Sequence, residues 1–287
     1  MAIIRFRPEI WSAMLLVALR KALIYAGPTI VNRDYEGEIA EAGDTVRITS
    51  VSRPTVGTYV PNQTTITPEE LTDAQRTMVV DQAKYFAFKV DDVDARQAKG
   101  TVMTQAMSEA AYAVADVIDQ YVAAFYTGAS PANVLGSTAS PINTYTVPTD
   151  AYDKVLVPLR TKLTKANVPT TGRYCTVSPE FHASLLLDGR FIKASESADP
   201  SALRNGQVGR AAGFDILESN NVPVPTGDIQ AITAGTNAAI SFAEAISKTE
   251  AYRPESGFSD AIKGLPLYGG KLVRPGCLAV AYIDPAA

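Results

Sequence analysis

Residues capable of catalytic or metal chemistry are few in this sequence, and they are scattered. His182 is the only histidine, and Cys175 and Cys277 are the only cysteines. An imidazole-activated nucleophile would have to use His182, with Cys175 seven residues before it. A lone histidine early in a helix is more often structural, and a histidine metal site needs several such ligands. We therefore expect no catalytic residues, no metal site and two buried free thiols, since neither a CxxC pair nor a disulfide framework is possible.

Two further segments resemble ligand-binding loops without matching them. The glycine-rich run Gly206–Gly213 (GQVGRAAG) fits neither the phosphate loop nor the dinucleotide fingerprint, so its glycines are expected in turns. Asp91, Asp92 and Asp94 could suggest a cation loop, but the glycine and distal glutamate of a calcium site are missing. A helix N-terminus accounts for these aspartates more simply. We expect no cofactor.

The charge distribution sets the N-terminus apart. The chain has 287 residues, is 46% hydrophobic and 20% charged, and has a net charge of −4, which excludes wholesale disorder and disfavours nonspecific DNA binding over its whole surface. Residues 1–33 nevertheless carry five basic residues against Glu9, a local charge of +4. Four of the basic side chains precede residue 24, namely Arg5, Arg7, Arg20 and Lys21. They form either the solvated face of a helix or an arm that faces an acidic partner, such as packaged DNA or an assembly chaperone.

No segment is typical of a membrane protein. The apolar run Met14–Leu19 is interrupted by Arg20 and Lys21, and no small-residue cleavage site follows it. No run reaches the roughly 18 apolar residues that a membrane helix needs. We expect a soluble protein made in a reducing cytoplasm.

The first third of the chain predicts a helix followed by an extended arm. Pro8 to Tyr25 reads as an amphipathic helix that ends before Gly27-Pro28, with Ile10, Met14, Val17, Ala18 and Leu23 as its apolar stripe. Thr45–Thr49 alternates like a strand, and a returning limb shows the same parity from Met78 to Val90. Between them, residues 52–76 have no helical period and are rich in strand-forming residues.

The length of this arm decides how it can be used. A compact chain of this size has a radius of gyration of about 19 Å, whereas a 20-residue strand limb can reach roughly 65 Å. A two-stranded hairpin is marginal in water by itself. Either a neighbouring subunit supports the arm, or the segment folds back into a local sandwich.

The remaining chain predicts an α+β fold. Thr101–Thr127 is the strongest helical pattern and would be about 40 Å long. A connector rich in proline, serine and threonine, residues 130–149, indicates a domain boundary. Asp150–Asn167 predicts a helix kinked at Pro158, and Ser178-Pro179-Glu180 is a helix start. The other predicted strands are Tyr174–Val177, Phe214–Leu217, Ile229–Thr233, Lys248–Tyr252, Leu265–Tyr268, Leu272–Val273 and Leu278–Ile283, and Ala238–Ile246 stays unassigned.

Several local sequences, taken in order, resemble tailed-bacteriophage major capsid proteins of the Hong Kong 97-type fold. They are Asn32–Ile39 with Gly43–Val46, Gly172–Pro179, Leu186–Phe191, Gly206–Pro223, Tyr252–Gly264 and Lys271–Pro275. Each motif is weak alone, and their common order over most of the chain carries the resemblance.

The resemblance implies a domain plan and a mechanical function. The plan has an N-terminal arm (1–40), an extended loop (41–92), a peripheral domain with a spine helix (93–149, with return strands in 248–287) and an axial domain (150–247). The implied function is a coat protein that assembles from hexamers and pentamers into an icosahedral shell around double-stranded DNA. The implied partners are further copies of the chain, a separate scaffolding protein, a portal protein and the packaged DNA, and the implied location is the virion, with assembly in the host cytoplasm.

The same resemblance indicates where subunits would touch. On the extended loop, Arg53, Tyr59, Gln63 and Arg76 are expected to contact the spine of a neighbouring subunit. In the peripheral region, Glu250, Arg253 and Asp260 are expected to form charged contacts. Some members of this group cross-link through a lysine on the loop, but this chain has no lysine between Lys21 and Lys84, so we expect no covalent link.

Two alternatives stay open on the sequence. A bacterial nanocompartment shell of the same fold would enclose protein cargo and not DNA. An uncharacterised soluble enzyme is the alternative of another class.

Overall fold

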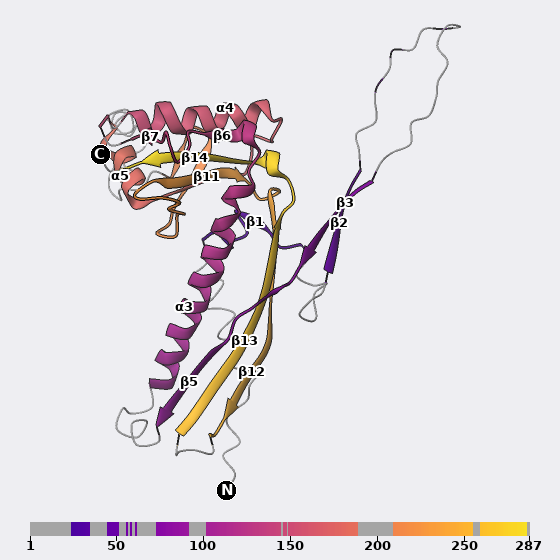
Figure 1. The fold of residues 1–287 in the computed structure, drawn as a ribbon, viewed down its shortest axis with the longest axis vertical. Coiled ribbons are helices and arrows are strands. Elements are labelled where there is room, and N and C mark those ends of the chain that lie inside the picture. Colours follow the sequence, from indigo (N-terminus) through magenta and orange to yellow (C-terminus); the bar gives the residue numbers. More distant parts are fainter. Residues whose placement is uncertain are drawn as a thin grey trace.

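The computed structural model describes residues 24–34, 45–51, 56, 58, 61, 73–91, 102–144, 146–147, 149–188, 209–254 and 259–285. These residues form two packed units and a projecting hairpin (Figure 1). The lower unit combines a long helix with a five-stranded sheet, and the upper unit is built on a seven-stranded sheet. The predicted α+β class is confirmed.

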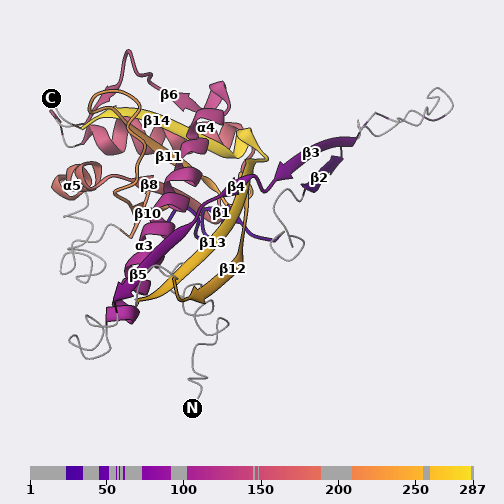
Figure 2. The ribbon, with the colours of Figure 1, turned by 60° about the horizontal axis from the view of Figure 1, so that its bottom comes forward.

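The lower unit, which we call the peripheral unit, packs helix α3 (Val102–Ala123) against a sheet of long strands. The sheet contains β1 (Val31–Asn32), β12 (Ile240–Tyr252), β13 (Ser259–Leu272), β4 (Gln82–Ala83) and β5 (Phe86–Asp91), with β12 and β13 antiparallel over most of their length. Because side chains alternate along a strand, Phe242 and Tyr268 share the face that packs with Ile118 of the helix. Among the described residues, no helix covers the opposite face of the sheet (Figure 2).

Helix α3 is slightly shorter than its periodicity predicts. The α-helical part ends at Ala123, and the last predicted turn is a 3-10 segment, Ala124–Gly128. Tightening of the final turn satisfies carbonyls that lack partners at a helix end. The helix predicted over Thr101–Thr127 is therefore present, and its role as the spine of a capsid subunit stays a prediction.

The hairpin consists of β2 (Thr45–Val51) and β3 (Asp73–Val79), paired antiparallel from Thr45 opposite Val79 to Val51 opposite Asp73. In Figure 1 it points away from both units. The predicted strand at Thr45–Thr49 is confirmed, while the returning limb is divided into β3, β4 and β5 and is not one strand. Most of the predicted arm between residues 52 and 72 lies outside the described residues.

The upper unit, which we call the axial unit, carries the second hydrophobic core. Its sheet runs β6-β14-β11-β8-β10-β9, and β7 also pairs with β14. The strands are β6 (Val134–Leu135), β7 (Ile142–Asn143), β8 (Arg173–Val177), β9 (Arg210–Ala211), β10 (Phe214–Glu218), β11 (Gln230–Thr236) and β14 (Leu278–Asp284). Helices α4 (Val157–Lys165) and α5 (Pro179–Leu187) contribute Leu159, Leu163, Phe181 and Leu185 to the core.

Two local features of the axial unit follow from residues at the starts of its helices. The helix expected over residues 150–167 begins with a π-helical turn, Ala151–Leu156, and becomes α-helical at Val157. Pro158 has no N–H to offer the preceding turn, so the wider turn absorbs the irregularity that we expected as a kink. In α5, Ser178 caps the helix by accepting a hydrogen bond from Phe181 N at 3.1 Å, as its sequence signature predicts.

The C-terminal strands divide between the two units. The unassigned stretch at Ala238–Ile246 contributes the first half of β12, and the strand predicted at Lys248–Tyr252 is its second half. The strand predicted at Leu265–Tyr268 lies within β13, which ends at Leu272, the first residue of the strand predicted at Leu272–Val273. The last strand, β14, pairs with β11 in the axial sheet. The predicted domain boundaries stay predictions. β14, which falls in the range predicted as return strands of the peripheral domain (248–287), pairs in the axial sheet.

Candidate intersubunit surfaces

The predicted contact residues fall into three groups. Arg53, Tyr59 and Gln63, like the basic residues Arg5, Arg7, Arg20 and Lys21, lie outside the described residues. Arg76 lies at the root of the hairpin. Glu250 and Asp260 lie on β12 and β13, and Arg253 directly follows β12.

The root of the hairpin is fixed to the peripheral sheet through β3. Met78 and Val80 are buried there, and Arg76 Nη1 donates to the Leu272 carbonyl at 3.3 Å. A Cβ added to Gly269 would lie 2.5 Å from the Val79 carbonyl oxygen, so only glycine lets the root pass this close to β13. Arg76 therefore bonds within its own subunit, and its contact with a neighbour stays a prediction.

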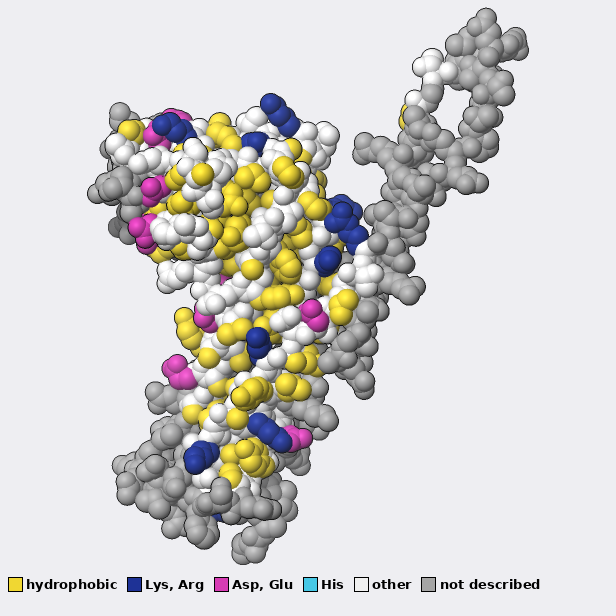
Figure 3. All heavy atoms as spheres, viewed as in Figure 1, with side chains coloured by type: hydrophobic (Ala, Val, Ile, Leu, Met, Phe, Trp, Pro, Cys, Tyr) yellow, Lys and Arg dark blue, Asp and Glu magenta, His cyan; other side chains and the backbone are white. Residues whose placement is uncertain are grey.

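The face of the peripheral sheet opposite α3 carries a hollow of about 370 Å³, where the start of β5 and the middle of β13 meet the last residues of β12. Three large apolar side chains are exposed there: Tyr85 (83%), Tyr252 (45%) and Leu265 (37%). They project from the face opposite α3, because Phe86 and Ile262, their neighbours of the other parity, pack in the core with the helix. We call this set the outer apolar patch. Figure 3 shows hydrophobic side chains gathered over these strands, with charged ones among them.

An ion pair, Lys263 with Glu250, lines the same hollow as the outer apolar patch. Lys263 Nζ lies 2.9 Å from Glu250 Oε2 and 5.2 Å from the centre of the Tyr252 ring. The hydrogen bond with Glu250 raises the pKa of Lys263. Of the predicted charged residues, Glu250 thus lines the hollow beside the outer apolar patch. Asp260 is half-buried on β13, Arg253 is exposed, and neither lines the hollow.

A buried carboxylate joins the N-terminal segment to both units. Asp119 of α3 is only 3% exposed, and its Oδ1 accepts from Ile24 N at 3.0 Å and Tyr25 N at 2.6 Å. Its Oδ2 accepts from Asn221 Nδ2 at 3.0 Å, and Asn221 follows β10 of the axial sheet. The point at which the N-terminal segment leaves the fold is therefore held against α3.

A second tie fixes the same segment to β12. Arg33 Nη1 lies 2.8 Å from Glu244 Oε1, and the guanidinium also donates to the Ala26 carbonyl from Nε and Nη2. The guanidinium carbon stands 5.3 Å from the centre of the Phe242 ring. Both the chain entering β1 and the chain leaving it are thus held in place.

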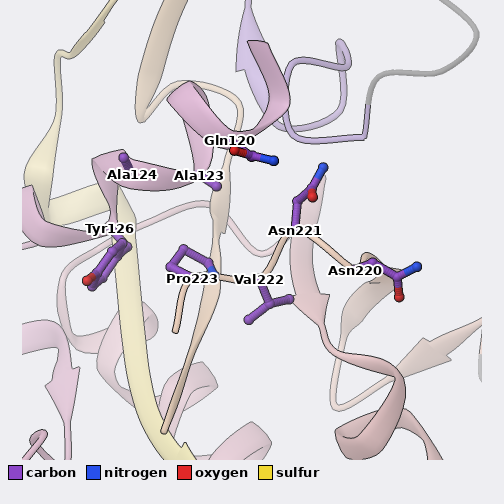
Figure 4. Close-up of a pocket in the computed structure, with 8 residues that line it drawn as sticks. All are labelled: Gln120, Ala123, Ala124, Tyr126, Asn220, Asn221, Val222 and Pro223. Carbon is purple, nitrogen blue, oxygen red and sulfur yellow. The ribbon is translucent and has the colours of Figure 1, made fainter. Parts of the chain in front are cut away.

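A cavity of about 300 Å³ lies beside this joint, between the end of α3 and residues 220–223 (Figure 4). Gln120, Ala123, Ala124 and Tyr126 line one side, and Asn220, Asn221, Val222 and Pro223 line the other. Its walls are amides, one phenol and small apolar groups, and no carboxylate, amine, imidazole or thiol is among the lining side chains.

The residues considered for chemistry are engaged or buried. His182 Nδ1 lies 2.7 Å from Glu218 Oε2. Cys175 is fully buried, and burial raises the pKa of its thiol, whereas Cys277 is half-buried. In the described part of the chain no three histidine, cysteine or acidic side chains are placed to share a metal ion. None of its helices is both long and apolar enough to cross a membrane.

Sequence reasoning missed the outer apolar patch. Tyr85 falls between two short strands, and Tyr252 and Leu265 look like ordinary strand residues. The available signal was parity: Tyr85 and Ala87 alternate with Phe86 and Phe88, so one of the two sets had to face away from the helix. Which set is exposed depends on the side on which α3 lies.

The chain is similar to known proteins in sequence and in fold. A family model described as phage capsid protein matches residues 73–281. A solved structure from Mycobacterium phage Che8 is 31% identical, with a TM-score of 0.70 over 88% of each chain. The capsid structure of cyanophage P-SCSP1u is 19% identical, with a TM-score of 0.64 over 85% of this chain and 84% of that one. No curated protein matches the sequence.

A more distant likeness bears on the nanocompartment alternative. The SrpI encapsulin from Synechococcus elongatus is 12% identical, with a TM-score of 0.53 over 87% of this chain and 85% of that one. At this identity the likeness concerns the fold alone, and it is weaker than the likeness to the two phage structures.

Proposed function

The chain belongs to the phage capsid protein family, and from this premise we propose that its copies form the hexamers and pentamers of an icosahedral shell around double-stranded DNA. It is a major capsid protein, a structural component of the virion that acts as a homo-oligomer. The finer proposal is that it works mechanically, without catalysis, and assembles in the host cytoplasm. A separate scaffolding protein, the portal protein and packaged DNA are the proposed partners.

One observation carries this proposal: the hairpin is fixed at its root and points away from its own subunit. β3 is held by the buried Met78 and Val80 and by the close passage over Gly269, whereas the paired strands beyond this root project from the fold (Figure 1). A projecting two-stranded ribbon needs further contacts to be stable. A second copy of the chain supplies them in a shell.

We place the contact on the outer apolar patch of a neighbour, on the sheet side of the peripheral unit and not on its spine helix. The patch offers Tyr85, Tyr252 and Leu265 for apolar packing. The arm is rich in threonine and carries Tyr59 and Val60 between residues 52 and 66, which suits a half-apolar surface. Glu250 is the proposed acidic partner of Arg53. The resulting contact is non-covalent.

Substitution of the patch tests this proposal. Tyr85→Ser with Leu265→Ser removes exposed apolar surface and should leave the subunit folded while reducing the yield of closed shells at least about tenfold. Val224→Ser is the matched control, because Val224 is 54% exposed on the axial unit, outside the patch. Negative-stain electron microscopy counts the shells, and circular dichroism checks the fold. Normal shell yield from the double variant would remove the patch from the contact.

Charge reversal tests the arm itself. Arg53→Glu should lower shell yield or shell melting temperature, whereas Arg76→Glu should also loosen the root, because Arg76 bonds to the Leu272 carbonyl. If both variants assemble and melt as the unmodified chain does, neither side chain is an intersubunit contact.

The nature of the cargo separates a phage capsid from a nanocompartment. We propose that shells purified from infected cells contain double-stranded DNA, and that the basic residues Arg5, Arg7, Arg20 and Lys21 belong to the inner surface. Nuclease-protected DNA inside the particles would support this proposal. Particles with protein cargo and no nucleic acid would favour the nanocompartment, and a uniform small monomer would reject a shell of either kind.

A further inference from the structure

One face of the spine helix α3 is left open to solvent, although it is partly apolar. Tyr112 is 66% exposed and Val117 is 40% exposed, and Ala113 between them is also exposed. The helix contains no lysine or arginine, and its two accessible charged residues, Glu109 and Asp116, are both acidic. This spine face, defined as Glu109, Tyr112, Ala113, Asp116 and Val117, is thus apolar and negative.

The segment before residue 24 has the complementary character. Residues 8–23 are mostly apolar, and their only basic residues, Arg20 and Lys21, stand near the end that joins the fold. A helix that is apolar on most of its circumference needs a surface to cover it. The predicted helix would expose Trp11, Leu15 and Leu19 if it had no partner.

The joint at Asp119 brings the two surfaces together. Because Ile24 N and Tyr25 N both donate to Asp119 Oδ1, the segment leaves the fold beside the spine helix itself. A segment tethered at this point meets the spine face at a high effective concentration, without waiting for another molecule.

The lengths of the two elements match. Residues 8–23 in helical form would span about 24 Å, and α3 from Asp119 back to Val102 spans about 26 Å. If the helix runs back along the spine from residue 24, residue 24 lies level with Asp119. A residue a given number of positions before residue 24 then lies level with the spine residue the same number of positions before Asp119. This register puts Lys21 level with Asp116, Arg20 level with the adjacent Ala115, and Ala18 level with Ala113.

We propose that residues 8–23 dock as a helix on the spine face of their own subunit. The apolar side chains cover Tyr112, Ala113 and Val117, and Arg20 and Lys21 neutralise Asp116. Docking engages the side chains of Arg20 and Lys21, which would otherwise be available to bind packaged DNA or a scaffolding protein. It depends on the contacts of this subunit alone and not on assembly of a shell.

Disulfide trapping tests the register. The double variant Ala18→Cys with Ala113→Cys, made in a Cys277→Ser background, should form an intrachain disulfide under mild oxidation and migrate faster on a non-reducing gel. The matched control pairs Ala18→Cys with Ala83→Cys, because Ala83 is exposed on β4, away from the spine. The pairing is expected only in the first variant. A dimer band would place the segment on a neighbouring subunit, and absence of any pairing would overturn the docking.

Limited trypsin digestion gives an independent readout on the otherwise unmodified chain. Arg20 and Lys21 are the only trypsin sites between Arg7 and Arg33, so loss of the N-terminal fragment reports their accessibility. Tyr112→Ser with Val117→Ser should speed this cleavage at least about tenfold in unassembled subunits, whereas the axial control Val224→Ser should not change it. Equal cleavage rates in all three chains would overturn the proposal, even if shells still form.

Discussion

Replacing Gly269 by alanine should displace the root of the projecting hairpin. The new Cβ would stand 2.5 Å from the Val79 carbonyl oxygen and 2.7 Å from Val80 Cα, about 0.9 Å and 0.7 Å short of the 3.4 Å at which ordinary contact begins. Both groups belong to the backbone, so no side-chain rotation can relieve the overlap. β13 or the root of the hairpin must move.

The size of the effect follows from the cost of overpacking. Forcing an extra methyl group into a packed site costs about 1–3 kcal/mol of unfolding free energy. In a chain of this size, a loss of about 2 kcal/mol corresponds to a melting temperature roughly 4–8 °C lower. A shifted root would also misdirect the hairpin, so closed shells should become fewer than the loss of stability alone explains.

Gly276→Ala is the matched control, because a Cβ at Gly276 meets nothing within 4 Å. Differential scanning calorimetry of unassembled subunits measures the stability, and electron microscopy of the assembly products counts closed shells. If Gly269→Ala melts within about 1 °C of Gly276→Ala and assembles equally well, the close passage at Gly269 does not hold the root in place.

Three other outcomes follow from the described contacts. Asp119→Ala removes the acceptor of Ile24 N and Tyr25 N, and leaving these donors unpaired should lower the unfolding free energy by about 2–4 kcal/mol, measured by urea denaturation; an unchanged midpoint would show that water replaces the carboxylate. In a Cys277→Ser background, Cys175 should resist a thiol reagent at pH 8 until the chain is unfolded, because burial raises its pKa and disfavours the thiolate; a fast reaction in the native state would contradict this burial. Shells heated in denaturing detergent should release monomers, because no lysine that could form an isopeptide link stands between Lys21 and Lys84, the part of the chain that holds the hairpin and its tip; a covalent ladder would refute this expectation.

Much of the element order could be predicted, because it depends on local patterns. The spine helix follows from a long run of apolar residues at three- and four-residue steps, and α5 follows from the Ser178 cap with Pro179 behind it. The hairpin strands follow from alternation. These signals lie within one stretch of chain, so they need no knowledge of its partners in space.

The outer apolar patch could not be predicted in the same way. Tyr252 and Leu265 stand on different strands, and they share a surface because β12 and β13 pair with a register shift between Ile246 and Lys248. The shift changes which residues of β12 face outward, so parity counted from Phe242 gives the wrong face for Tyr252. The face on which Tyr252 lies is therefore known only from the strand pairing in the folded structure.

The sequence by itself predicted the α+β class, the long helix and a strand-forming arm that needs either a neighbouring subunit or a local sandwich to support it. Composition, spacing and periodicity are sufficient for such conclusions. The tertiary structure decided where the arm is fixed, which sheet face is left uncovered, and that one buried carboxylate, Asp119, joins the N-terminal segment to both units. The Asp119 contacts join residues 94 to 102 positions apart in the chain, and the contact of Arg76 with Leu272 joins residues 196 positions apart. Burial and register at such distances are set by the packing of the whole fold.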